Sequence, residues 1–185
     1  MKIFCVGRNY VDHAKELNNE VPENPVIFMK PKSALLSNAS HFIYPEFTNE
    51  LHYEAELVFR ICKNGRYISN NNALQYVDAV TVGIDFTARD IQTELKKKGL
   101  PWEIAKAWDG SALVGNWQTF DEDELNTGIL FSLQKDGETV QQGNSSHMIF
   151  SVAKVINYIS QYFSLNIGDL LFTGTPAGVG ECMAG

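Results

Sequence analysis

Short apolar runs separated by polar and glycine-containing segments dominate the chain. Runs of this length that contain β-branched and aromatic residues are typical of strands. The pairs Asn64-Gly65 and Asp136-Gly137 favour tight hairpins, because both central residues of a type I′ turn need a positive φ. The pattern predicts a mostly antiparallel β protein, with strands at 2–6, 26–30, 53–62, 79–86, 128–134 and 170–173.

Three segments have helical features. Residues 11–18 are short and polar. Residues 88–98 follow Thr87, a candidate N-cap, and stop before Gly99, which favours a helix end. The clearest helix is predicted within 148–163, where apolar residues recur at helical spacing and can pack on a sheet. Its apolar positions are Met148, Val152, Val155, Ile156, Ile159 and Phe163, and its candidate caps are Ser145 and Ser146.

Composition and charge narrow the class of protein. A chain of 185 residues suits one domain with a substantial core. With 44% hydrophobic and 20% charged residues, the composition is that of a globular protein. A net charge of −7 disfavours nucleic acid and anionic membranes as partners. Cys5, Cys62 and Cys182 are widely spaced and form no CxxC motif, so neither a disulfide framework nor a zinc finger is indicated and a cytoplasmic location is expected.

Three carboxylates lie on two of the predicted strands. Glu54 and Glu56 are two positions apart in LHYEAELVF, so on a strand they share one face, where their charges repel. Asp85 ends another apolar run. Oxygen donors without a histidine ligand pattern suit a hard cation such as Mg²⁺ better than zinc. Glutamates that face water on an exposed edge strand would give the same pattern, and the residues alone leave both interpretations open.

His13 and Glu16 are three positions apart, which places them on one face of a helix. A carboxylate beside an imidazole orients the ring and raises its basicity, so the pair could activate a water as a general base. Taken alone, the spacing is more typical of an exposed polar helix. The other histidines, His41, His52 and His147, have no such partner and are expected to be structural.

Basic and amide side chains follow Asp85. Arg89 and Gln92 share a helix face, where Arg89 could bind a substrate carboxylate through its planar fork and Gln92 could add an amide contact. An ion pair between Arg89 and the acids is the alternative. Lys106 stands among aromatic and apolar residues in WEIAKAW. It could stabilise enolate charge beside a carbonyl, or it could extend to the surface without a role.

The segment TGTPAGVG at 173–180 follows a predicted strand. It matches neither a Walker A loop nor a dinucleotide-binding fingerprint. It could offer backbone N–H groups and the Thr175 hydroxyl to an anion, or it could be a structural turn. Asp90 is expected to cap a helix, and the run Lys96–Lys98 is expected to complement a helix dipole rather than to serve in catalysis.

Taken in order, these segments resemble the fumarylacetoacetate hydrolase family, in particular its short acylpyruvase-like branch. The matching segments span Gly7 to Gly180 and are NYVDHAKE, PVIFMKPKSALL, YEAELVFRI, GIDFTARDIQ, AKAWDG, SSHMIFSVAKVINYIS and GDLLFTGTPAGVG. The resemblance implies a β-rich α+β fold, a mixed β-sandwich roll with few short helices. Residues 1–185 would form a single catalytic domain, with a lid segment within residues 1–20, and two chains would form a homodimer.

The resemblance also implies roles for individual residues. Glu54, Glu56 and Asp85 match the ligands of a divalent metal, Mg²⁺ or Mn²⁺. His13 and Glu16 match the water-activating dyad, and Lys106 matches a lysine beside the reacting carbonyl. The positions that match substrate contacts are Arg89, Gln92 and Thr175.

The reaction that this resemblance implies is metal-dependent hydrolysis of a C–C bond in an acylpyruvate-type β-diketo acid, which gives pyruvate and a carboxylic acid. Two alternatives use the same site: decarboxylation or tautomerisation of oxaloacetate, and double-bond isomerisation of a 2-hydroxyhepta-2,4-diene-1,7-dioate type of substrate. A third is a metal-dependent 2-oxo acid binding protein without catalysis.

The chain departs from the family pattern at two places. After Lys106, the run AWDGSALVG lacks a proline found in many relatives, so the pocket wall with Trp102 and Trp108 is expected to differ. After Gly180, the sequence ends at ECMAG, where relatives continue, so a truncated or shortened C-terminal end is expected.

Overall fold

The computed structural model describes residues 1–16, 21–36, 41–119 and 121–183. Within these ranges the largest sheet has seven strands, in the order β2-β1-β11-β4-β5-β7, with β8 paired to β5. β1 and β11 run parallel, and the other neighbouring pairs run antiparallel. The strands are β1 (Ile3–Gly7), β2 (Val26–Lys30), β4 (Ala55–Ile61), β5 (Val77–Asp85), β7 (Ala112–Val114), β8 (Gln118–Thr119) and β11 (Leu170–Phe172).

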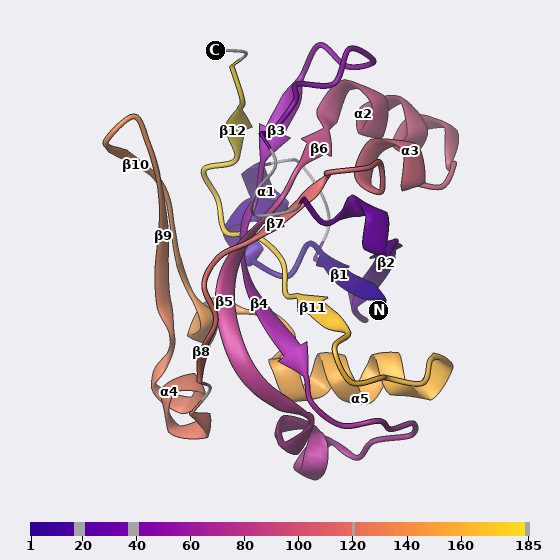
Figure 1. The fold of residues 1–185 in the computed structure, drawn as a ribbon, viewed down its shortest axis with the longest axis vertical. Coiled ribbons are helices and arrows are strands. Elements are labelled where there is room, and N and C mark those ends of the chain that lie inside the picture. Colours follow the sequence, from indigo (N-terminus) through magenta and orange to yellow (C-terminus); the bar gives the residue numbers. More distant parts are fainter. Residues whose placement is uncertain (17–20, 37–40, 120, 184–185) are drawn as a thin grey trace.

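Two smaller sheets flank the largest one. β3 (Leu51–Tyr53) pairs with β6 (Thr87–Ala88) and β12 (Gly180–Glu181), and β9 (Leu130–Lys135) pairs with β10 (Glu138–Asn144). Figure 1 shows β4 and β5 curving through the centre, while β9 and β10 form a ribbon to one side. The prediction of a β-rich α+β roll is therefore confirmed.

The helices are short. They are α1 (Val11–Glu16), α2 (Arg89–Lys98), α3 (Glu103–Lys106), α4 (Glu122–Thr127) and α5 (Val152–Tyr162), together with 3₁₀ turns at Lys32–Ala34, Asn70–Tyr76 and Ser145–His147. Residues 17–20, which include the end of the predicted first helix and of the predicted lid, lie outside the described residues. No helix of the described part of the chain is long and apolar enough to span a membrane.

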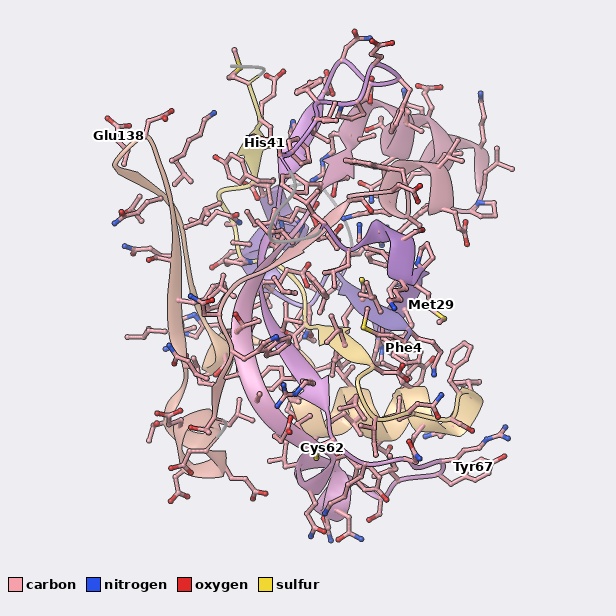
Figure 2. The ribbon with its side chains drawn as sticks, in the orientation of Figure 1. Phe4, Met29, His41, Cys62, Tyr67 and Glu138 are labelled. Carbon is pink, nitrogen blue, oxygen red and sulfur yellow. The ribbon has the colours of Figure 1, made fainter. Side chains whose placement is uncertain are left out.

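Both faces of the large sheet are buried. Successive side chains of a strand point to opposite faces, and in β1 Phe4 belongs to one apolar cluster while Ile3 and Cys5 belong to another. The first cluster packs against α5, whose apolar face has the predicted spacing. The ring of Phe4 lies 5.6 Å from that of Phe163, beside the end of α5, and Figure 2 shows Phe4 between the sheet and this helix. This packing fixes β1 and β11 next to β4.

One of the two predicted hairpin turns is present. Asp136 and Gly137 have φ values of 54° and 85° and join β9 to β10, as a type I′ turn requires. Asn64 and Gly65 do not have positive φ, and Gly65 instead pairs with Leu165 across an isolated bridge. The predicted hairpin at Asn64-Gly65 is therefore wrong.

Two predicted helix caps are also wrong. The side chain that accepts a hydrogen bond at the start of α5 is Ser151, because Ser145 and Ser146 belong to a separate 3₁₀ turn. α2 follows Ala88 and has no side-chain cap, so Thr87 does not have the predicted role. Asp90 accepts hydrogen bonds from Ile91 and from the 48–49 loop, which it fastens to the helix start. Gly99 ends α2 with φ 63°, as expected.

Candidate active site

The three predicted carboxylates meet where β4 and β5 are paired. The predicted strand at 53–62 is interrupted at Glu54, between β3 and β4, and Glu56 is the second residue of β4. Asp85 ends β5, and its backbone N–H donates to the carbonyl of Glu54 at 2.9 Å. One ligand oxygen from each carboxylate lies within 4.8 Å of the others, and all three residues are buried. The alternative interpretation, in which Glu54 and Glu56 face water on an exposed edge strand, is thereby excluded.

Close approach of the chains at this point depends on Gly83. It lies opposite Glu56 in the β4–β5 register. A Cβ atom at Gly83 would come within 2.7 Å of the Leu113 carbonyl oxygen and 2.9 Å of the Phe172 ring. Because such distances are shorter than van der Waals contact allows, any larger side chain would push β5 away from its neighbours.

Three buried cations surround the carboxylates. Lys106 Nζ donates to Glu54 Oε2 at 2.8 Å and to Asp85 Oδ2 at 2.7 Å. Arg89 forms a short ion pair with Glu54 from the other side. Lys30 Nζ lies 2.8 Å from Asp85 Oδ1 and donates to the Ser111 carbonyl oxygen at 3.0 Å. Sequence reasoning missed Lys30, which ends a strand and is fully buried.

The positive charge is distributed unevenly among the acids. Burial alone would raise the pKa of Glu54, but Lys106 and Arg89 outweigh it and hold that pKa well below its usual range. Burial and the charges of Asp85 and Glu54 raise the pKa of Glu56 well above its usual range. Glu56 accepts a hydrogen bond from the Gly174 N–H at 2.7 Å, and no basic side chain of the described residues lies within ion-pair distance of it.

This arrangement fits a divalent cation. The donor set consists of carboxylate oxygens, which Mg²⁺ and Mn²⁺ prefer. Glu56 lacks a compensating charge, and Asp85 Oδ1 accepts no well-directed hydrogen bond within the described residues although Lys30 is close. The ligand oxygens of one octahedral Mg²⁺ lie about 3.0 to 4.2 Å apart, given metal–oxygen distances of about 2.1 Å. A small inward shift of the three carboxylates would satisfy that geometry.

His13 and Glu16 form a pair on α1. His13 Nδ1 lies 3.2 Å from Glu16 Oε2, and the other oxygen of Glu16 accepts a hydrogen bond from the Gly178 N–H at 3.1 Å. A carboxylate at Nδ1 assigns the proton to that nitrogen, so Nε2 keeps its lone pair. Burial lowers the pKa of His13, which keeps the ring neutral and able to accept a proton at neutral pH.

Arg89 and Gln92 lie on one face of α2. Arg89 donates to Gln92 Oε1 at 2.6 Å and, through Nε, to His52 Nδ1 at 3.4 Å. The ion pair between Arg89 and an acid, which was the alternative to substrate binding, is present with Glu54. Arg89 also lines the pocket. His52, expected to be purely structural, orients this arginine.

The glycine-rich segment closes the site behind Glu56. Gly174 has φ 97°, and a Cβ there would come within 2.8 Å of Asn9 Cβ, so glycine is required on two counts. Thr175 donates its hydroxyl to the Ala55 carbonyl at 2.8 Å and accepts from Gln141 Nε2 at 2.9 Å. Gln141 also accepts from the Ala55 N–H at 2.9 Å, which locks the loop to β4. No sequence motif marked Gln141.

Eight of the nine predicted site residues line one pocket. Glu16, the ninth, lies behind His13. Trp102 belongs to the wall, as expected, whereas Trp108 packs against Phe42 and Phe47 away from it. The eight lining residues are His13, Glu54, Glu56, Asp85, Arg89, Gln92, Lys106 and Thr175.

Comparison with known proteins identifies similar chains. A family model described as fumarylacetoacetate (FAA) hydrolase C-terminal matches residues 2–184. Oxaloacetate tautomerase FAHD1, mitochondrial, of Bos taurus is 40% identical over 178 residues, which cover 96% of this chain and 80% of that protein. Oxaloacetate decarboxylase, mitochondrial, of Dictyostelium discoideum is 40% identical over 185 residues, which cover 100% and 85%.

A solved structure is similar throughout. Fumarylpyruvate hydrolase from Pseudomonas aeruginosa, in complex with Mn²⁺ and pyruvate, superposes with a TM-score of 0.91 and is 39% identical. The match covers 99% of this chain and 81% of that one. Because two of the similar proteins carry mitochondrial names, a cytoplasmic location for this chain stays a prediction.

Proposed function

Because this chain belongs to the fumarylacetoacetate hydrolase family, we propose that it catalyses enolisation of a small 2-oxo acid, with oxaloacetate as the favoured substrate. The observation that supports this most is the buried carboxylate triad, which faces one pocket together with a neutral imidazole and a buried ammonium group. Relatives named as oxaloacetate tautomerase and oxaloacetate decarboxylase support the choice of substrate.

Glu54, Glu56 and Asp85 would hold Mg²⁺ or Mn²⁺. When bound, the cation supplies positive charge that anchors a 2-oxo acid and favours negative charge on its carbonyl oxygen. Lys30 forms an ion pair with Asp85 and is fully buried, and it does not line the pocket. Arg89, aligned by Gln92 and His52, can grip the carboxylate next to the keto group with its planar fork.

Proton transfer falls to His13. In tautomerisation its free Nε2 takes a proton from C3 of oxaloacetate, the C3–H electron pair forms the C2–C3 double bond, and the carbonyl oxygen becomes an enolate oxygen. The Lys106 ammonium stabilises that oxygen, and His13 returns the proton to it. The Thr175 hydroxyl donates to Ala55 and accepts from Gln141, so one lone pair remains to accept a hydrogen bond from the enol.

Decarboxylation would use the same electron sink. The C3–C4 bond breaks, carbon dioxide leaves, and the electron pair enters the same enolate, which takes a proton at C3 to give pyruvate. This step needs the enolate-stabilising charges but no base at C3. His13 therefore separates the two reactions, because only tautomerisation begins with removal of a proton.

Hydrolysis of an acylpyruvate is a second candidate, favoured by the His13–Glu16 pair. A water held by Nε2 would lose a proton to His13 and attack the distal carbonyl. The C–C bond would then break to give a carboxylic acid and the enolate of pyruvate. Glu16 would stabilise the imidazolium that forms, and its own orientation is fixed by Gly178.

A substrate panel tests these functions. The wild-type protein is assayed with Mn²⁺, and with EDTA as a control. The substrates are the enol and keto forms of oxaloacetate, acetylpyruvate and fumarylpyruvate. Each reaction is monitored by the absorbance of the enol and by the release of pyruvate. We expect metal-dependent loss of the oxaloacetate enol signal, abolished in Glu56→Gln and retained in Glu138→Gln, an exposed control at the β9–β10 turn. Activity unaffected by EDTA would contradict the metal-centred function.

The variant His13→Asn discriminates among the reactions. We expect it to lose tautomerisation and acylpyruvate cleavage but to retain decarboxylation. Loss of acylpyruvate cleavage alone would restrict His13 to water activation. Absence of turnover on every substrate, together with Mn²⁺-dependent binding of oxalate, would indicate the non-catalytic binding protein instead.

We also propose that the chain is one catalytic domain and forms a homodimer. Light scattering after size-exclusion chromatography would give twice the mass of the chain for the dimer. Limited proteolysis would leave one resistant core that includes both β1 and β11, since these strands are paired.

A further inference from the structure

We propose that Arg8 and Lys96 bind the second carboxylate of a dicarboxylic 2-oxo acid and so select dianionic substrates over monocarboxylic ones. This inference rests on the proposed function and names the substrate class of the same pocket. Both residues line the pocket that contains the carboxylate triad.

Lys96 faces the pocket because of its position on α2. Arg89, Gln92 and Lys96 are spaced so that they form one stripe along the helix, and all three line the pocket. Its neighbours Lys97 and Lys98 are exposed. All three lysines lie in the last turn of α2, as expected, but Lys96 is half-buried and its Nζ lies 5.5 Å from the centre of the Trp102 ring.

Arg8 comes from the opposite wall. It follows β1, whose Val6 and Gly7 also line the pocket, and it has φ 60°. A left-handed conformation at a residue other than glycine is strained, and functional sites often retain such strain. Its Nε is buried and has no hydrogen-bond partner among the described residues.

The two cations lie near each other and lack an anion. Burial, together with the charges of Arg8 and Arg89, lowers the pKa of Lys96 to about 8. In the part of the chain that the structure describes, no carboxylate is within ion-pair distance of Arg8 or Lys96. An unbalanced pair of this kind favours a bound anion.

The charges of the whole pocket point to the same substrate. Lys30, Arg89 and Lys106 equal the three acids of the triad in number, although they pair only with Glu54 and Asp85, so Arg8 and Lys96 add positive charge beyond that number. A divalent cation would increase the excess. The carboxylate next to the keto group would use Arg89, which leaves Arg8 and Lys96 for a second carboxylate at the far end of a short diacid.

A pair of 2-oxo acid ligands, of which only one carries a second carboxylate, tests the inference. Calorimetry of the Mn²⁺-loaded protein compares 3,3-difluoro-oxaloacetate, which has two carboxylates and no C3 hydrogen, with pyruvate, which has one carboxylate. The variants are Lys96→Gln and Arg8→Gln, with Lys98→Gln as a control that removes the same charge from an exposed position on the same helix.

We expect the wild type and Lys98→Gln to prefer the dicarboxylate. Lys96→Gln and Arg8→Gln should bind it roughly tenfold or more weakly, the effect of losing one charge-assisted hydrogen bond, while pyruvate affinity changes little. Lys96→Arg should retain the preference. If Arg8→Gln fails to fold, Lys96→Gln decides the outcome alone.

Equal loss of affinity for both ligands, or no loss for either, would overturn the assignment of a second carboxylate site while leaving the proposed function intact. Failure of the wild type to bind either ligand in the presence of Mn²⁺ would overturn both.

Discussion

Glu56 should have opposite effects on the stability of the metal-free protein and on metal binding. Its carboxyl group is buried, and its pKa is raised by burial and by Asp85 and Glu54. Glu56→Gln keeps the oxygen that accepts from Gly174 and removes the charge. We expect the variant to be more stable than the wild type in EDTA at pH 7, and to lose the stabilisation that Mn²⁺ provides.

The sign follows from the raised pKa. The unfolded chain ionises Glu56 near its ordinary pKa of about 4.3, whereas the folded chain does so only at higher pH. Stability contributed by this group is complete below the unfolded pKa and is lost as pH rises through the folded pKa. Each unit of elevation corresponds to about 1.4 kcal/mol, so the advantage of Glu56→Gln should grow above pH 4.3 by up to that amount per pH unit and level off above the folded pKa.

Metal binding should reverse the order of stability of the wild type and Glu56→Gln. Mn²⁺ at 100 times its dissociation constant should stabilise the wild type by about 2.7 kcal/mol. For a chain of this length, that free energy raises the melting temperature by about 5 to 11 °C. Glu56→Gln loses one of three carboxylate ligands and should show little shift.

Thermal denaturation followed by circular dichroism checks both signs, in EDTA and in Mn²⁺, between pH 4 and 8. Glu138→Gln, a charge removal at an exposed position, should behave as the wild type. A variant less stable than the wild type in EDTA at pH 7, or one that keeps the full Mn²⁺ shift, would refute the reasoning.

Three further predictions concern other groups of the site. Lys30→Met leaves Asp85 Oδ1 without its buried ion-pair partner, while Lys106 still contacts Oδ2, and it should lower the free energy of unfolding by about 3 kcal/mol. Arg60→Met, at the exposed pair with Asp78, should lower it by about 1 kcal/mol or less, and urea denaturation measures both. Gly174→Ala combines a positive φ with a close contact and should cost about 2 kcal/mol or more, whereas Gly168→Asn, which has open space, should cost less than 1 kcal/mol. The pH profile of kcat/KM for tautomerisation should have an acid limb whose apparent pKa is below the ordinary histidine pKa of about 6.5, because burial lowers the pKa of His13. An apparent pKa above about 6.5 would contradict the role of His13 as the neutral base.

Strand positions could be predicted because the apolar runs that form them are local. β2 matches the predicted 26–30, the predicted strand 53–62 is interrupted at Glu54, and the other predicted strands differ at their ends. The turn at Asn64-Gly65 could not be predicted, because glycine has more than one use. A Cβ at Gly65 would come within 2.4 Å of the Tyr76 ring, so this glycine permits close packing and not a positive φ. Which of the two uses applies to Gly65 depends on Tyr76, eleven positions further along the chain.

The acidic part of the site was predictable only through the resemblance to the family, since the residues alone left an exposed edge strand as an equal interpretation. Lys30 and Gln141 carried no signal of a role in the site. A lysine at the end of a strand is usually exposed, and Lys30 is buried only because pairing of β1 with β2 and β11 brings it behind Asp85. Gln141 lies on a hairpin and reaches Ala55 and Thr175 through the tertiary arrangement alone.

The two buried lysines illustrate why the role of a residue needs the structure. Lys30 is fixed by hydrogen bonds to the backbone of Lys106 and to Ser111, in addition to its ion pair with Asp85. Lys106 Nζ, among the described residues, donates only to the carboxylates of Glu54 and Asp85 and faces the Phe28 ring at 5.2 Å. A divalent cation drawn to Glu56 would share both of those carboxylates and repel the ammonium. Lys106 lines the pocket, where a substrate oxygen needs a donor, whereas Lys30 lies outside the pocket lining and is paired with Asp85.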